Sequence, residues 1–130
     1  MDNFKVLLVD DEDDFRETLQ KRLRNRKLQV EGAENGYKAL EMLQSQDFDV
    51  VILDVKMPGM DGIQTLQEIK IKKPEVEVIM LTGHASVESG IQGMQLGAFD
   101  YVMKPVPLDE LLDKMRQAYE RKTMRASHGG

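Results

Sequence analysis

The hydrophobic positions of the chain follow two different spacings. Runs of consecutive apolar residues are typical of buried strands, whereas apolar residues three or four positions apart indicate helices. Apolar runs predict strands at residues 6–9, 28–31, 50–53, 76–81 and 99–103. Helical spacing predicts five helices, marked by Phe15, Leu19 and Leu23, by Tyr37, Leu40 and Leu43, by Ile63, Leu66 and Ile69, by Val87, Ile91 and Met94, and by Leu108, Leu111, Leu112, Met115 and Tyr119. Asp61 precedes the third of these helices and is placed to cap it.

The regular alternation of strand and helix predicts an α/β fold with a parallel sheet that is covered on both faces. Crossovers between parallel strands are right-handed, and the common arrangement for five strands is the doubly wound, flavodoxin-like order 2-1-3-4-5. The chain of 130 residues fits one domain. We expect this (βα)5 domain to occupy residues 1–121. Residues 122–130 lose the periodicity and are expected to be a polar tail, the start of a linker, or residues foreign to the natural chain.

Composition narrows the class of protein. The net charge is −5, which argues against direct nucleic-acid binding, because that usually requires a basic face. The chain has no cysteine, so it has neither disulfides nor thiolate metal sites. No apolar run approaches the roughly 18 residues of a membrane span, and the N-terminus lacks the pattern of a signal peptide. These features predict a cytoplasmic protein that does not associate with membranes.

Candidate chemistry gathers where the predicted strands end. In a doubly wound sheet, ligands bind beyond the carboxyl ends of the strands, at the point where the strand order reverses. The residues at these ends are Asp10, Asp11 and Glu12 after the first strand, Asp54 after the third, Thr82 after the fourth and Lys104 after the fifth. Two carboxylates about 4 Å apart repel by roughly 4 kcal/mol at an effective dielectric constant of about 20. A divalent cation such as Mg²⁺ would offset that repulsion.

Each of these residues alone has an ordinary structural explanation. Asp54 alone would be a loop starter, Lys104 a surface lysine and Thr82 a residue with strand propensity. Their combination changes the interpretation, because the segments are remote in sequence and meet at one edge of the sheet. Carboxylates, Mg²⁺, a lysine and a threonine suit an aspartyl-phosphate, with Asp54 as the nucleophile.

Four motifs carry a resemblance to a known family. They are VLLVDDE, VVILDVKMPGMDG, VIMLTGHAS and GAFDYVMKPV, in this order along the chain. Together they resemble the receiver domain of two-component response regulators, over about residues 4–119. The form of the last two motifs is most similar to receivers attached to sigma-54-dependent transcription activators.

The resemblance implies roles for the acidic residues. Asp54 would accept a phosphoryl group from a phosphohistidine on a sensor histidine kinase. Asp11 would bind Mg²⁺ (or Mn²⁺), with Asp10 as a second or water-mediated ligand. The carboxylate of Asp54 and the backbone carbonyl of Lys56 would complete the metal ligands from the protein.

The resemblance also implies how the signal leaves the site. Thr82 would move toward the phosphoryl group, Lys104 would pair with it, and Tyr101 would turn inward as the aromatic switch residue. The Lys104–Pro105 peptide bond would be cis. Lys56 and His84 fall at positions that vary within the family and affect how long the phosphoryl group survives, so its lifetime stays open.

The resemblance predicts a signalling protein that assists its own phosphorylation and dephosphorylation and is not an enzyme acting on a separate substrate. Its partners would be the kinase and an effector domain or downstream protein that regulates transcription. A homodimer is compatible with it, and the polar tail favours a piece of a longer regulator. The alternative is a Mg²⁺-dependent phosphatase of the haloacid dehalogenase type, but those enzymes need an acid where this chain has Lys56. A binding module with an inactive site is disfavoured because Asp54 and Lys104 are both intact.

Overall fold

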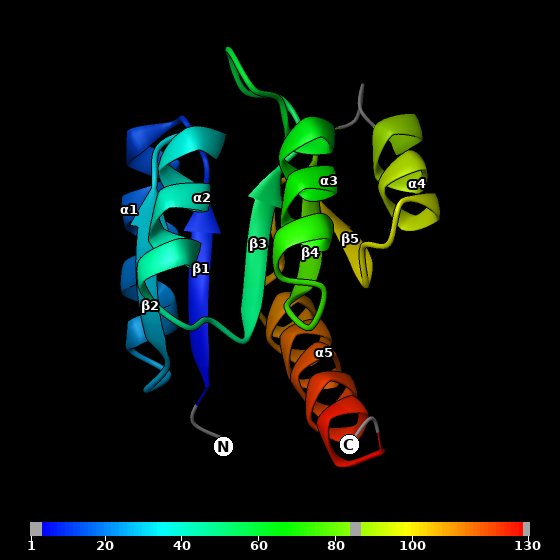
Figure 1. Ribbon diagram of the computed structural model, residues 1–130. Helices are drawn as coiled ribbons and strands as arrows, with labels where there is room; N and C mark the ends of the chain where they lie inside the picture. The colour runs from blue at the N-terminus through cyan, green and yellow to red at the C-terminus, as the bar shows by residue number, and fades with distance from the viewer. Residues whose placement is uncertain (1–3, 84–86, 129–130) are drawn as a thin grey trace.

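The sheet has the predicted topology. The structure, a computed structural model, describes residues 4–83 and 87–128; the predicted role of His84 lies outside these residues. Five parallel strands pair in the order β2-β1-β3-β4-β5 (Figure 1). The strands are β1 (Lys5–Val9), β2 (Gln29–Ala33), β3 (Val50–Asp54), β4 (Glu77–Thr82) and β5 (Asp100–Met103). The helices are α1 (Asp13–Arg24), α2 (Gly36–Ser45), α3 (Gly62–Lys72), α4 (Val87–Gln95) and α5 (Leu108–His128). The predicted doubly wound fold is therefore confirmed.

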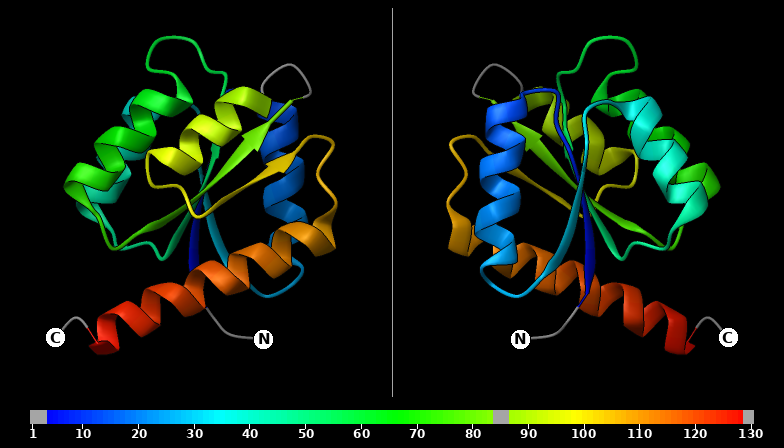
Figure 2. Two further views of the ribbon diagram at one scale, coloured as in Figure 1. Left: turned by 90° about the vertical axis from the view of Figure 1, so that its right-hand side faces the viewer. Right: turned by 90° about the vertical axis from the view of Figure 1, so that its left-hand side faces the viewer.

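Helices bury both faces of the sheet. Successive side chains of a strand point to opposite faces, so Val6 and Leu8 pack in the cluster that includes residues of α1 and α5. Leu7 and Val9 pack on the other face, in the cluster with residues of α2 and α3. Figure 2 shows α1 on one side of the sheet and α2 and α3 on the other. β3 is buried along its whole length, which explains why its sequence is an unbroken apolar run up to Asp54.

Asp61 is the N-cap of α3, as predicted. Its side chain accepts a hydrogen bond from the backbone N–H of Gln64 at 2.8 Å, and the side chain of Gln64 accepts one from the N–H of Asp61 at 3.1 Å. This capping box satisfies two amides that have no partner within the helix. It fixes the start of α3 directly behind the loop that follows Asp54.

The last helix is longer than the sequence indicated. Helical structure continues past residue 121, because α5 runs to His128, and the assignment of residues 122–130 as a tail or linker start stays a prediction. Ion pairs hold the added turns at the amino-terminal edge of the sheet. Lys122 Nζ lies 2.7 Å from Asp49 Oδ1, and Arg121 Nε lies 2.9 Å from Glu77 Oε2. Figure 2 shows this part of α5 running past the strands. Within residues 4–83 and 87–128, no helix has the length and apolar character needed to cross a membrane.

Glu77 should be important for anchoring these turns. Its side chain is fully buried at the start of β4 and also lies 3.5 Å from Arg125 and 3.8 Å from Lys70. We expect Glu77→Gln to lower the free energy of unfolding by about 1–3 kcal/mol, because glutamine carries no charge to pair with these cations. Urea denaturation followed by circular dichroism measures this change. Amide exchange should also become faster in residues 119–125.

The matched control for Glu77→Gln is Glu75→Gln, because Glu75 is exposed two residues away. It should leave both the stability and the amide exchange unchanged. Equal stability of the two variants would show that the ion pairs at Glu77 do not anchor α5.

Candidate functional site

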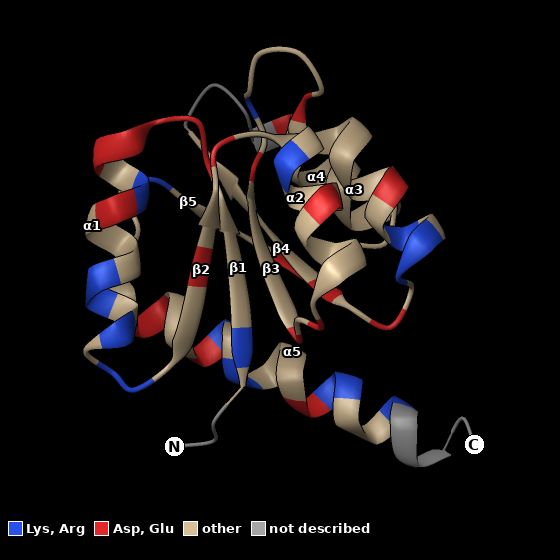
Figure 3. Ribbon diagram, turned by 60° about the vertical axis from the view of Figure 1, so that its left-hand side comes forward, with Lys and Arg blue, Asp and Glu red and all other residues tan. Residues whose placement is uncertain are grey.

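Three carboxylates meet at the carboxyl edge of the sheet, as predicted. Asp10 and Asp11 follow β1, and Asp54 is the last residue of β3, the neighbouring strand. One oxygen atom from each of the three lies within 4.8 Å of the others. Asp10 and Asp54 are buried, whereas Asp11 is exposed. Figure 3 shows acidic segments gathered at the upper ends of the strands, close to the start of α1.

Lys104 supplies a positive charge to this cluster. Its Nζ lies 3.0 Å from Asp10 Oδ2 and 3.7 Å from Asp54 Oδ1. Its backbone N–H donates a hydrogen bond of 2.7 Å to the carbonyl of Thr82. The ammonium group also lies 4.3 Å from the centroid of the Phe15 ring, a favourable cation–π distance. The chain thus holds Lys104 at the acids both through β5 and through the packing of its side chain.

Burial of the acids raises their pKa values. The pKa of Asp54 is raised from 3.8 to about 7, mainly by burial and then by the charge of Asp10, while Lys104 opposes the shift. Burial also raises the pKa of Asp10, against its hydrogen bonds to the Glu12 amide and to Lys104. Burial of the ammonium group lowers the pKa of Lys104, but Asp10, Asp54 and Glu12 together outweigh burial, so the pKa is raised. A further positive charge at the site would lower the pKa values of both acids and favour their ionised forms.

Thr82 and Tyr101 lie next to each other beneath α4. Thr82 is fully buried at the end of β4, and within the described residues its Oγ1 has no hydrogen-bond partner. A Cβ atom built on Gly90 of α4 would lie 3.0 Å from Thr82 Cγ2 and 3.1 Å from the Tyr101 ring. Gly90 is therefore required for the close approach of α4, and this packing connects the Thr82 side chain to α4 and β5. A buried hydroxyl group without a partner is costly and is thus ready to bond to a ligand.

Two predictions about the site remain: the cis peptide bond before Pro105 and the binding of a metal by Lys56. The Lys104–Pro105 peptide bond is cis, which confirms that prediction. Lys56 is exposed, and its backbone amide lowers the pKa of Asp54. The proposed binding of a metal by the Lys56 carbonyl stays a prediction.

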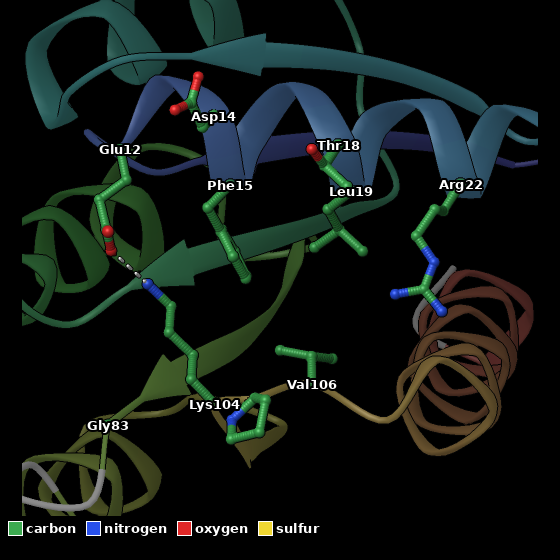
Figure 4. A pocket seen from close by; sticks show the side chains of 10 residues that line it. Glu12, Asp14, Phe15, Thr18, Leu19, Arg22, Gly83, Lys104 and Val106 are labelled. Carbon is green, nitrogen blue, oxygen red and sulfur yellow. Dashed lines mark hydrogen bonds and ion pairs between the residues drawn. The ribbon is translucent and has the colours of Figure 1, made fainter.

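A groove opens beside the acids, between α1 and the segment that follows β5. Its volume is about 670 Å³, and its walls include Phe15, Leu19 and Val106. Figure 4 shows Lys104 at one end of this groove and Arg22 at the other. An apolar groove that ends at a charged site can hold a partner and present a reactive group to that site.

Sequence reasoning did not find one contact of the site. The sequence places Glu12 among the acids after the first strand, and the structure pairs it with Lys104, with 3.2 Å between Glu12 Oε1 and Lys104 Nζ. The two residues are 92 positions apart, and the sequence holds no local signal for their contact.

A divalent cation fits this donor set. Three carboxylates that converge within 4.8 Å offer the oxygen ligands that Mg²⁺ prefers. Burial raises the pKa values of Asp10 and Asp54, and a bound cation would favour their ionised forms.

Known proteins are similar to this chain in sequence. The family model of the response regulator receiver domain matches residues 6–116. The transcriptional regulatory protein ZraR of Escherichia coli is 40% identical over 117 residues, which cover 90% of this chain and 26% of that protein. The DNA-binding transcriptional regulator NtrC of Escherichia coli is 38% identical over 113 residues, which cover 87% of this chain and 24% of that protein. The chain thus spans about a quarter of the length of these relatives.

A solved structure matches this chain in fold and over nearly its whole length. A response regulator receiver domain protein from Clostridium thermocellum superimposes with a TM-score of 0.89 and 34% sequence identity, covering 93% of this chain and 98% of that one. The region matched by the family model, residues 6–116, contains β2 to β5, β1 from Val6 onward, and the edge of the sheet that carries the acids. On the fold, the clustered acids and these similarities, the chain belongs to the response regulator receiver domain family.

Proposed function

We propose that this domain is a phosphorylation-activated signalling switch in which Asp54 accepts a phosphoryl group from a sensor histidine kinase. The observation that carries the proposal is the meeting of Asp54 with two further acids and Lys104 at the carboxyl edge of the sheet. Family membership supports it, because the matched region contains all these residues.

The transfer begins with the ionised carboxylate of Asp54. One oxygen of Asp54 attacks the phosphorus atom, a P–O bond forms, and the P–N bond to the kinase histidine breaks. Lys104 lies 3.7 Å from the nearer carboxylate oxygen of Asp54 and stabilises negative charge on the phosphoryl oxygens. The hydroxyl of Thr82 donates a hydrogen bond to one of these oxygens, which gives the buried group a partner that it lacks among residues 4–83 and 87–128.

Asp10, Asp11 and Asp54, with the carbonyl of Lys56, would hold Mg²⁺ or Mn²⁺. Once bound, the ion supplies positive charge that keeps the carboxylates ionised and neutralises the oxygens of the transferred group. The backbone at the ends of β1 and β3 places these carboxylates where the ion would bind.

The output surface comprises α4, β5 and α5. When Thr82 moves toward the phosphoryl group, it vacates space next to the Tyr101 ring, and both residues contact the position of Gly90 in α4. Tyr101 is only partly buried, so its ring is free to turn inward. This two-state packing would change the exposed face of α4, where the side chains of Ile91 and Met94 are exposed.

The kinase would dock in the groove between α1 and the segment after β5. The apolar wall at Phe15, Leu19 and Val106 suits a helix that carries the phosphohistidine, and Lys104 stands at the end nearest Asp54 (Figure 4). The effector would be a transcription regulator of the sigma-54-dependent kind, supported by the similarity to ZraR and NtrC. It could act through a homodimer, in the cytoplasm and without binding of nucleic acid by this domain.

A direct test is the intact mass of the protein after incubation with acetyl phosphate and Mg²⁺. We expect one phosphoryl adduct on the wild-type protein and none when EDTA replaces Mg²⁺. The absence of any adduct, or an adduct of equal yield on Asp54→Asn, would refute the assignment.

The same experiment separates the switch from the phosphatase alternative. Steady turnover of a phosphate ester by a protein that stays unmodified would indicate a phosphatase. No contact in the described residues favours that alternative, and Lys56 stands where such enzymes need a second acid.

A further inference from the structure

Glu12 lies at the site although no role has been assigned to it. Its Oε1 is 3.2 Å from Lys104 Nζ, close to the distance of 3.0 Å at which Asp10 binds the same ammonium group. Asp54, the proposed phosphoacceptor, is farther away at 3.7 Å. Figure 4 shows Glu12 reaching from the start of α1 to Lys104 across the end of the groove.

The backbone of Glu12 is held by a hydrogen bond, whereas its side chain can move. Glu12 is the N-cap residue of α1, yet its side chain makes no capping hydrogen bond. Its backbone N–H instead donates a bond of 2.8 Å to Asp10 Oδ1. The side chain is 67% exposed, so the carboxylate can leave Lys104 for solvent at little cost.

Lys104 therefore divides one positive charge among three carboxylates. Asp10 is buried and cannot withdraw, whereas Glu12 is exposed and can. An incoming phosphoryl group needs the ammonium group that Glu12 occupies, and its own negative charge repels the Glu12 carboxylate.

We propose that Glu12 is a positioning residue that competes with the phosphoryl donor for Lys104 and thereby slows phosphorylation of Asp54. The proposal rests on the proposed function of Asp54 as phosphoacceptor. Glu12 acts through Lys104 and does not touch the reacting atoms. It keeps Lys104 engaged in the unphosphorylated protein and limits transfer from small donors that lack the binding energy of a docked kinase.

The test compares rates of adduct formation by intact mass, over a range of acetyl phosphate concentrations with Mg²⁺ fixed. Exposed ion pairs are typically worth up to about 1 kcal/mol, which corresponds to about fivefold in an equilibrium. We expect Glu12→Gln to lower the half-saturating donor concentration by about two- to fivefold and to leave the limiting rate unchanged. Glu12→Asp keeps the charge and should restore a value close to that of the wild type.

Glu17→Gln is the matched control. Glu17 is exposed on the same helix, and its substitution makes the same change in net charge. It should behave as the wild type, because a general effect of net charge is small at the distance and salt concentration of the assay.

The outcomes are distinct. Equal half-saturation for the wild type, Glu12→Gln and Glu17→Gln would overturn the role of Glu12 and leave Asp54 as the acceptor. An equal gain in both glutamine variants would also overturn it, since net charge alone would explain the change. No adduct on the wild-type protein would refute the proposed function itself.

Discussion

Asp54→Asn is expected to abolish the phosphoryl adduct and, in the metal-free protein at pH 8, to raise the free energy of unfolding by about 2–4 kcal/mol. Burial and the nearby charges oppose the ionisation of Asp54, the proposed phosphoacceptor. They raise its pKa from 3.8 to about 7, with burial first and the charge of Asp10 second. Asparagine has nearly the same shape and no charge to desolvate. The proposed phosphoacceptor would thus reduce the stability of the protein that contains it.

The direction of the pKa shift determines the pH range in which the variant is more stable than the wild type. Below the unfolded-state pKa of 3.8, the carboxyl of Asp54 is protonated in both states, and the variant gains nothing. Between that value and about 7, the unfolded chain loses the proton while the folded protein keeps it, so the wild type becomes less stable relative to the variant. Above the folded-state pKa the difference is constant.

Urea denaturation followed by circular dichroism, at pH 4, 6 and 8 with EDTA, measures the difference. The chain has no tryptophan, so indole fluorescence offers no signal. Asp11→Asn is the control, because Asp11 is exposed and contributes less to the shift than burial or Asp10; its gain should be smaller. A gain from Asp54→Asn that is as large at pH 4 as at pH 8 would contradict the explanation.

Gly62→Ala is expected to lower the free energy of unfolding by about 3 kcal/mol or more, the upper end of the range for overpacking. A Cβ atom at this position would overlap the backbone carbonyl oxygen of Asp54 and lie 2.6 Å from the Cα of Val55. Both obstacles are backbone atoms and cannot rotate away. The first turn of α3 would have to move, and the hydrogen bond from Gly62 N–H to the Val55 carbonyl, now 2.9 Å, would be strained.

Chemical denaturation measures the loss, and the yield of the phosphoryl adduct shows whether Asp54 has moved with the loop. Gly83→Ala is the matched control, since a Cβ atom there would meet no atom of the described residues within 4 Å, and it should leave stability nearly unchanged. If Gly62→Ala were as stable as Gly83→Ala, the close approach of α3 to β3 would not restrict this position.

Much of the fold could be predicted because local patterns and packing agree. The unbroken run of Val50 to Leu53 predicts a strand buried on both faces, and β3 is that strand. Asp61 predicts the start of α3 through cap chemistry, and the capping box confirms it. The spread of acids over the ends of separate strands predicted their meeting, because parallel strands bring their carboxyl ends to one edge.

The extent of α5 was not predictable in this way. Its last turns lack an apolar stripe, and their stability comes from ion pairs with Asp49 and Glu77 at the opposite edge of the sheet. A charged residue at the start of a predicted strand gives no sign that it will be buried. Only the fold shows that cations of α5 surround Glu77.

The sequence by itself therefore determined the order of elements, the strand topology and the set of acids at one edge, because these follow from periodicity and from the geometry of parallel sheets. The tertiary structure alone decided how charge is distributed among them. It buried Asp10 and Asp54, left Asp11 exposed, and placed Glu12 on Lys104. Burial and pair distances depend on side chains that are remote in sequence, and electrostatic energy varies steeply with both.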